Sequence, residues 1–385
     1  MMRKFDLLAS LRTLPSDLKL IFLSLFLWTF GIGLYTYIWS LFLREIGADS
    51  TQVGTVYLLG FLAAALTMIP GGLLANKYDL KPIIIIGWAI SIPAPIFYYY
   101  AHSWPQAIPG FLILQLSAFN LPAINAYIAA SAKGRVSSAF GTTYSAAPLG
   151  IVLSPVIGSL LLTWMDVRGL FLISVVIFAI STIVLLPIKA QPRLPQDTAS
   201  PIIEVPRSRS ERTLLLYIFI AAIAFTLVQP FLPLFYHDLL SLTDPQVQLV
   251  GAVQSLGGVA FAILLGRRAE RSGKGRSIAT GLLVTTVGLI GLVVFRNPFF
   301  AVPFIFLVGG ARAPGYVAYS TVSGLSGVST RGGRFGFYLT LENLGFAIGP
   351  YIGGYLYGIN PLILFVVTAV FFVGLAGFAL REIKV

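Results

Sequence analysis

Two charged side chains fall inside long apolar runs, where their types allow proton chemistry. Arg312 lies near the centre of the run 298–324, and Glu342 lies about two helical turns into the run 335–358. A charge at membrane depth is costly and usually functional, so we expect the two to pair. Protonation of Glu342 would then free Arg312 for an anionic group, or a cation could displace the proton. The alternative is a permanent structural ion pair.

Several uncharged polar side chains lie at a similar depth in other runs. Together with Arg312 they form the predicted substrate-binding set: Asn120, Gln229, Tyr35, Tyr316 and Tyr319. Amides and phenol hydroxyls offer hydrogen bonds, and the rings offer a flat face to an organic solute. Each of these residues taken singly could instead serve helix–helix packing, and both interpretations stay open.

Twelve apolar runs must position these side chains. Of the 385 residues, 57% are hydrophobic and 10% are charged, whereas soluble domains carry about 25% charged residues. A membrane-spanning helix needs about 20 mostly apolar residues. Runs of this length occur at 18–43, 52–75, 81–102, 106–131, 137–164, 169–188, 213–240, 246–267, 276–295, 298–324, 335–358 and 361–380. The sequence therefore predicts an all-α membrane protein with twelve transmembrane helices.

The basic residues gather in alternate loops between these runs. The other loops hold only Arg44, Arg168 and Arg296. By the positive-inside rule this bias places both termini in the cytoplasm and predicts a multi-pass protein of the cell membrane. The net charge of +12 is therefore no sign of nucleic-acid binding. With no Cys and only two His, the chain offers no disulfide and no Cys-based metal site, and we predict neither metal nor cofactor.

One long polar segment divides the chain. Residues 188–212 are rich in Pro, Ser and mixed charge, which is typical of a flexible linker. We predict an N-terminal six-helix bundle at 1–187, a cytoplasmic linker at 188–212 and a C-terminal six-helix bundle at 213–385.

The two halves repeat at an offset of about 195 residues. The fifth run carries small residues and Pro at fixed separations, and the eleventh run repeats these separations. The matched positions are Gly141, Gly150, Ser154, Pro155 and Gly158 in the first half, and Gly336, Gly345, Gly349, Pro350 and Gly353 in the second. Arg44–Glu45 likewise matches His237–Asp238. Equivalent runs fall six apart, so the bundles are expected to be pseudo-symmetric and to enclose a central substrate path.

The loops after the second and eighth runs resemble a motif of the major facilitator superfamily, G-x3-D-[RK]-x-G-[RK]-[RK]. The first copy holds Gly72, Asn76, Lys77 and Asp79, and the second holds Gly266, Glu270, Arg271 and Gly273. In that family the acid docks near a helix N-terminus and locks the cytoplasmic gate, which the helix dipole favours. The resemblance implies the same gate here. Asn76 carries no charge, so the first lock is expected to be weaker or to use Asp79.

The eleventh run also resembles the family pattern G-x8-G-x3-G-P-x2-G-G, which is associated with antiporters. All six fixed positions match, ending in Gly353 and Gly354, and the first half replaces two of the Gly with Ser154 and Ser159. Small residues let helices approach closely, and Pro kinks them. The motif favours an exporter, but tight packing alone would also explain it.

The resemblance implies a monomeric secondary active transporter that moves a small organic or amphipathic solute across the lipid bilayer by alternating access. Proton-coupled efflux is the first interpretation. The run 18–43 has no acid, and Asn120 stands where the family has a functional Arg. Import of a small organic anion or sugar therefore stays open, and a transporter-derived receptor ranks third. No nucleophile–base pair, His cluster or phosphate loop supports an enzyme.

Overall fold

A computed structural model describes residues 11–132, 136–191, 209–315, 317–318 and 331–383, and within them the regular structure is helical. The N-terminal half contains α2 (Ser16–Gly33), α3 (Trp39–Glu45), α4 (Ser50–Lys77), α5 (Leu80–Ser91), α6 (Ala94–Tyr100), α7 (Trp104–Leu116), η1 (Ser117–Asn120), α8 (Leu121–Ser131), α9 (Val136–Tyr144), α10 (Ala146–Leu161) and α11 (Val167–Leu185). The C-terminal half contains α12 (Arg209–Val228), η2 (Gln229–Phe231), α13 (Leu232–Leu240), α14 (Asp244–Ser272), α15 (Lys274–Val294), α16 (Pro298–Gly309), η3 (Gly310–Arg312), α18 (Arg331–Ile359) and α19 (Pro361–Glu382).

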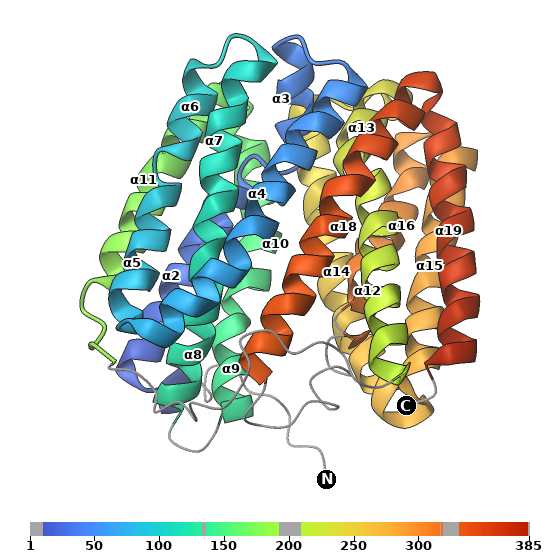
Figure 1. The fold of residues 1–385 in the computed structure, drawn as a ribbon. Coiled ribbons are helices and arrows are strands. Elements are labelled where there is room, and N and C mark those ends of the chain that lie inside the picture. Colours follow the sequence, from blue (N-terminus) through green and yellow to red (C-terminus); the bar gives the residue numbers. More distant parts are fainter. Residues whose placement is uncertain (1–10, 133–135, 192–208, 316, 319–330, 384–385) are drawn as a thin grey trace.

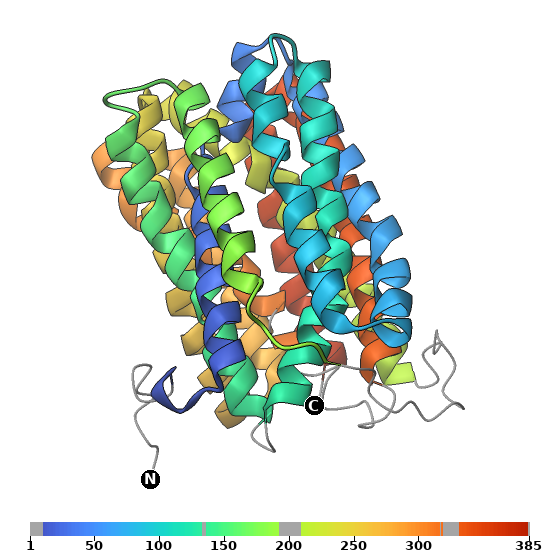
Figure 2. The ribbon, with the colours of Figure 1, turned by 90° about the vertical axis from the view of Figure 1, so that its left-hand side faces the viewer.

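These helices form twelve membrane spans in two bundles. Within the described residues, 11 stretches are long and apolar enough to cross a membrane. The 29-residue helix α18 supplies the twelfth. The N-terminal half lies beside the C-terminal half, and α2 begins at the end of the molecule where α19 finishes (Figure 1). After a turn of 90°, helices of both halves are seen to run between the same two ends (Figure 2). The predicted twelve-helix, two-bundle fold is confirmed.

Several spans are broken, although the sequence predicts continuous runs. The first span is interrupted at residues 34–38, and the fourth, seventh and tenth pass through the short 3-10 helices η1, η2 and η3. Pro lacks an amide hydrogen and clashes with the preceding turn, so it disrupts a regular helix. Pro122, Pro230 and Pro314 lie in or just after these 3-10 helices. The breaks η1 and η3 end at Asn120 and Arg312, which are equivalent positions of the repeat.

The Gly positions of the eleventh span serve close packing on two neighbours. A Cβ at Gly345, Gly349 or Gly353 would overlap backbone or side-chain atoms of α12. A Cβ at Gly354 would overlap the backbone of Ser50 in the other half. The first copy behaves in the same way, because Gly150 and Gly158 pack on the first span. These contacts agree with the packing interpretation of the motif. Gly141 has open space around it, and the surroundings of Gly336 lie outside the described residues.

We call the end of the molecule with the α4–α5 and α14–α15 turns the basic end, and the other the opposite end. Hydrogen bonds between the halves gather toward the opposite end. They are Arg44 Nη1 to Asp238 Oδ2 (2.6 Å), Arg44 Nη2 with His237 Nδ1 (3.1 Å), Tyr37 OH with Ser255 Oγ (2.7 Å), Ser159 Oγ to Pro245 O (2.7 Å), and Gln248 Nε2 to Gly33 O and Leu34 O (both 2.7 Å). The structure therefore shows a conformation in which the halves are joined at the opposite end.

Gly353 provides a test of the packing role. The change Gly353→Ala places a methyl group against the backbone oxygen of Leu227, and we expect a loss of about 1–3 kcal/mol in unfolding free energy from overpacking. Gly358→Ala on the same helix is the matched control, because its Cβ meets open space. Thermal unfolding in detergent would measure both. Equal stability of the two variants would contradict the packing role.

Gln248 provides a test of the joined conformation. Its fully buried amide donates to two carbonyls at the end of α2, where the helix break leaves them without helical donors. In Gln248→Ala we expect the opposite end to open more often. A Cys introduced by Ser255→Cys should then react with a soluble maleimide about five-fold faster or more, which is the change in rate that corresponds to a coupling of about 1 kcal/mol. The chain has no native Cys, so labelling is specific. Thr286→Ala, a buried change inside the C-terminal half, should leave the rate unaltered.

Candidate functional site

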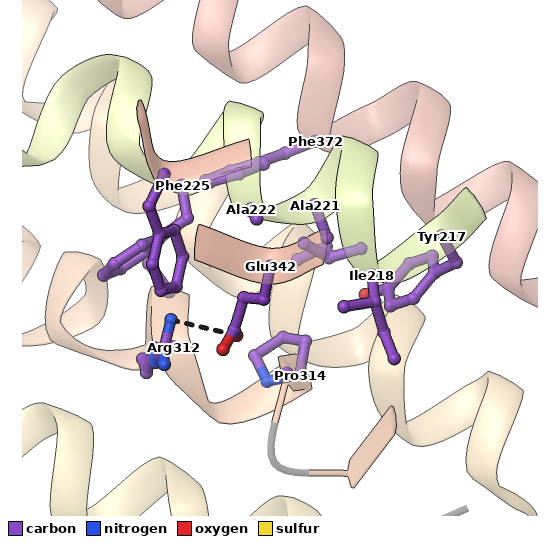
Figure 3. A pocket seen from close by; sticks show the side chains of 13 residues that line it. Tyr217, Ile218, Ala221, Ala222, Phe225, Arg312, Pro314, Glu342 and Phe372 are labelled. Carbon is purple, nitrogen blue, oxygen red and sulfur yellow. Dashed lines mark ion pairs between the residues drawn. The ribbon is translucent and has the colours of Figure 1, made fainter. Parts of the chain in front are cut away.

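Arg312 and Glu342 face each other in the C-terminal half, as expected. Arg312 ends η3, and Glu342 lies on α18. The Arg312 Nη1 atom lies 3.3 Å from Glu342 Oε1, with the Glu342 side chain 7% exposed and the Arg312 side chain 33% exposed (Figure 3). A nearly buried carboxylate without a positive partner would be very costly at this depth. The predicted pair is present, and its role in proton coupling stays a prediction.

Two aromatic rings surround the Arg312 guanidinium. Its central carbon lies 4.5 Å from the ring centre of Phe346 and 5.5 Å from that of Phe225. A guanidinium over an aromatic face is stabilised by the ring quadrupole, and more so when water is excluded. Phe225 comes from α12 and Phe346 from α18, so the base is held by the neighbours of its own span. The sequence does not single out these two rings, because Phe occurs 29 times in the chain.

A small cavity adjoins the ion pair. Its volume is about 30 Å³, and its wall includes Tyr217, Phe225, Leu282, Arg312, Glu342 and Phe372 (Figure 3). The lining residues all belong to the C-terminal half. A cavity of this size holds one or two water molecules rather than an organic solute. The space next to the carboxylate is therefore suited to proton exchange through water. Within the part of the chain that the structure describes, no group of three or more His, Asp or Glu residues could hold a metal ion.

Gln229 is part of a polar network one helical turn from Phe225. The Gln254 amide donates to Gln229 Oε1 (3.3 Å), and Tyr236 OH donates to Gln254 Oε1 (3.0 Å). Gln254 also lies close to the tenth span, because a Cβ at Gly309 would overlap its carbonyl oxygen. Neither Gln254 nor Tyr236 belongs to the predicted substrate-binding set. The pairing of two amides with a phenol across one span boundary has no periodic signature in the sequence.

The other predicted substrate residues are placed apart from this network. The Asn120 side chain lies against Gly87 of α5, inside the N-terminal half, and is 4% exposed. Tyr35 is 3% exposed and packs against the rings of Trp39, Tyr98 and Phe171. The structure therefore puts Tyr35 in the aromatic core of its bundle, which corresponds to the packing interpretation. Tyr316 and Tyr319 lie outside the described residues.

The predicted gate residues lie in the turns at the basic end. Asp79 caps α5, because its Oδ1 atom accepts from Lys81 N at 2.8 Å. It also accepts from Gln191 N, at the start of the predicted linker, at 3.4 Å. Lys77 lies over the Tyr78 ring, Gly72 and Gly266 have open space around them, and Glu270 and Arg271 are exposed. Asn76 is exposed too. Gly273 has φ +89°, a conformation that favours glycine at the junction of α14 and α15.

Comparison with known proteins shows the family. The family model described as Major Facilitator Superfamily matches the chain twice, at residues 21–216 and 214–384. The chain belongs to the major facilitator superfamily. Each match covers one of the two six-helix halves seen in the structure.

Several relatives in the superfamily are named as multidrug resistance or efflux proteins. The chain is 24% identical over 378 residues to multidrug resistance protein MdtG from Proteus mirabilis (strain HI4320), covering 92% of this chain and 93% of the relative. It is 24% identical over 338 residues to a multi-drug resistance efflux pump PmrA homolog from Lactococcus lactis subsp. lactis (strain IL1403), covering 83% of this chain and 82% of the relative. The similarity thus extends over both halves.

Solved structures of the superfamily share the fold. The nucleoside transporter NupG superposes with a TM-score of 0.77 at 16% identity, covering 96% of this chain and 100% of that chain. The human organic anion transporter MFSD10 (TETRAN) superposes with a TM-score of 0.71 at 15% identity, covering 95% and 100%. At identities this low the superpositions show a shared fold, and one fold can serve chemically different solutes. The family match, together with the membrane spans, makes the chain a multi-pass membrane transporter.

A charge-removal series tests the energetics of the ion pair. Arg312→Met leaves the Glu342 carboxylate buried without its partner, and we expect a loss of about 1–3 kcal/mol in unfolding free energy, reduced by the partial exposure of Arg312. Adding Glu342→Gln removes the unpaired charge and should restore most of that stability. Thermal unfolding of the single and double variants forms a double-mutant cycle. Simple additivity of the two changes would show that the pair contributes no coupling.

Proposed function

We propose that this chain is a secondary active transporter that exports a small organic or amphipathic compound in exchange for protons. The observation that carries the proposal is the Arg312–Glu342 pair, a nearly buried acid 3.3 Å from its base beside a water-sized cavity. Relatives named for multidrug efflux, which match more than 80% of the chain, support the export direction. We place the transporter in the cell membrane as a monomer, with both termini in the cytoplasm and no bound cofactor.

Protonation would act on the pair as a switch. With Glu342 ionised, its attraction for Arg312 holds α18 against η3. When a proton binds to a carboxylate oxygen, the charge that balances Arg312 disappears and the pair is weakened. The weakened pair allows the two helices to separate, so the free energy of proton binding is coupled to movement of the bundles. Reciprocity requires that separation of the pair also changes the proton affinity of Glu342.

The remaining predicted residues have proposed roles around this switch. Gln229 and Arg312 would bind the solute from the C-terminal half, with Asn120, Tyr316 and Tyr319 as the further predicted contacts. The turns with Asp79 and Glu270 would close the basic end in the alternate conformation. Closing that end would require the hydrogen bonds at the opposite end, such as Tyr37 to Ser255, to break.

Transport of an organic anion is a second candidate, favoured by the exposure of Arg312. One third of its side chain is exposed while it contacts Glu342, and this exposure would let a second anionic group approach it. In that case protonation of Glu342 and binding of the anion would occur together, since the two events combined leave Arg312 with one negative partner. Proton and anion would then move in the same direction. Exchange requires that they occupy the site in turn.

Flux in proteoliposomes under an imposed pH gradient tests the proposal. The probes are ethidium, an aromatic cation, and fluorescein, an aromatic anion. We expect the pH gradient to drive ethidium against the proton flow. Glu342→Gln should reduce this pH-driven flux about five-fold or more, which corresponds to a coupling of about 1 kcal/mol. Downhill exchange of ethidium should persist in this variant. Glu382→Gln, an exposed acid at the end of α19, is the control.

The outcomes separate the candidates. Fluorescein moving with the protons would favour the anion carrier. A Glu342→Gln variant with the full pH response would show that coupling uses another group.

A further inference from the structure

One row of side chains on α18 connects the other half of the molecule to the ion pair. Residues four apart on a helix lie on the same face. Gly354 packs on Ser50, the carbonyl of Pro350 packs on Gly54, and both neighbours belong to the N-terminal half. One turn further, the Phe346 ring meets the Phe61 ring of α4 at a centroid distance of 5.5 Å. The next residue of the row is Glu342.

Phe346 is therefore shared between two contacts. One is with Phe61 across the boundary of the halves, and the other is with the Arg312 guanidinium, 4.5 Å from its ring centre. Phe225 lies 6.2 Å from Phe346 and completes the wall from within the C-terminal half. A displacement of Phe61 thus changes the support of one of the two rings that hold Arg312. Phe225 keeps its own contact with Arg312 in either case.

We propose that Phe61 is a positioning residue of the proton site, acting through Phe346. While the Phe61 ring contacts Phe346, the Phe346 ring holds Arg312 beside Glu342. This position of Arg312 favours the ionised carboxylate. When the halves rock, Phe61 withdraws, Arg312 loses this support, and Glu342 becomes easier to protonate. Phe61 thereby links the position of the N-terminal half to the proton affinity of an acid in the C-terminal half. This inference rests on the proposed proton coupling through Glu342.

Arg312 is the charged group near Glu342 that the Phe61–Phe346 contact can affect. Among the described residues that line the cavity with Glu342, the titratable side chains are Arg312 from η3 and Tyr217 from α12. The walls from α15 and α19 are apolar, through Leu282 and Phe372. Tyr338 lies one turn from Glu342 on α18 itself. Neither Tyr carries charge near neutral pH. A pH response of this site is thus determined by the Arg312–Glu342 pair.

Spin-label distances across the pH range test the inference without a known solute. The chain has no Cys, so Trp164→Cys and Phe299→Cys introduce two labelling sites. Both positions are highly exposed, and one belongs to each half. In bilayer nanodiscs we expect the distance distribution of the otherwise unaltered protein to shift as the pH falls from about 7.5 to about 3.5, a range that includes the ordinary Glu pKa of about 4.3. Glu342→Gln should abolish the shift.

Phe61→Ala should then reduce the pH-dependent shift about five-fold or more, corresponding to a coupling of 1 kcal/mol. Phe61→Tyr, which keeps the ring, should retain it. Leu66→Ala on the same helix is the matched control, because Leu66 is 76% exposed. Should Phe61→Ala fail to fold, Phe61→Leu preserves bulk without the ring and is expected to show the same loss.

The outcomes distinguish this inference from the proposed function. If Glu342→Gln abolishes the shift and Phe61→Ala or Phe61→Leu retains it fully, Phe61 is not a positioning residue and proton coupling through Glu342 stands. If the shift is absent in the unaltered protein or persists in Glu342→Gln, coupling through Glu342 is wrong and the inference fails with it. A loss in Leu66→Ala equal to that in Phe61→Ala would show a general effect of weakening α4.

Discussion

The cost of a charge in the membrane interior constrains the whole C-terminal half. Arg312 and Glu342 are stable at this depth only while they stay within reach of each other. Their 3.3 Å separation depends on how closely α18 approaches its neighbours. Gly345, Gly349 and Gly353 provide that approach, because any side chain there would overlap α12. The small-residue motif thus packs α18 against α12, the helix whose Phe225 ring contacts Arg312.

The two halves share their backbone arrangement, whereas the Arg312–Glu342 pair occurs in the C-terminal half alone. Asn120 and Arg312 both end a 3-10 break at equivalent positions of the two halves. At the repeat offset of 195 residues, the counterpart of Glu342 is Ala147. The N-terminal half thus lacks both members of the pair rather than one. This agrees with the energetics, since a single buried charge without its partner costs far more than a neutral pair of residues. Each half can keep the same helix packing with or without the charges.

The sequence alone predicts the spans and the ion pair, but not which way most other side chains face. The spans follow from apolar length, and the Arg312–Glu342 pair follows because no other charges lie deep in a span. Phe225 and Phe346 could not be selected, since aromatic residues are abundant and their partners depend on helix rotation. Tyr35 illustrates the same difficulty. Its depth suggested a solute contact, but the break at residues 34–38 turns it into the aromatic core. Depth is encoded in the sequence, whereas the direction of a side chain depends on tertiary packing.

The geometry of a single helix explains how α18 can serve two functions. Residues four apart are displaced by about 40° around the axis, because the helix has about 3.6 residues per turn. The row from Gly354 through Pro350 and Phe346 to Glu342 therefore turns by about 120° over three steps. At one end it faces α4 of the other half, and at the other end it faces the cavity within its own half. A single continuous helix thus connects the boundary of the halves to the acid. The equivalent row on α10 reaches Ala147, where nothing titrates. Under the proposed coupling, a rocking movement of equal size in both halves would change proton binding in the C-terminal half alone.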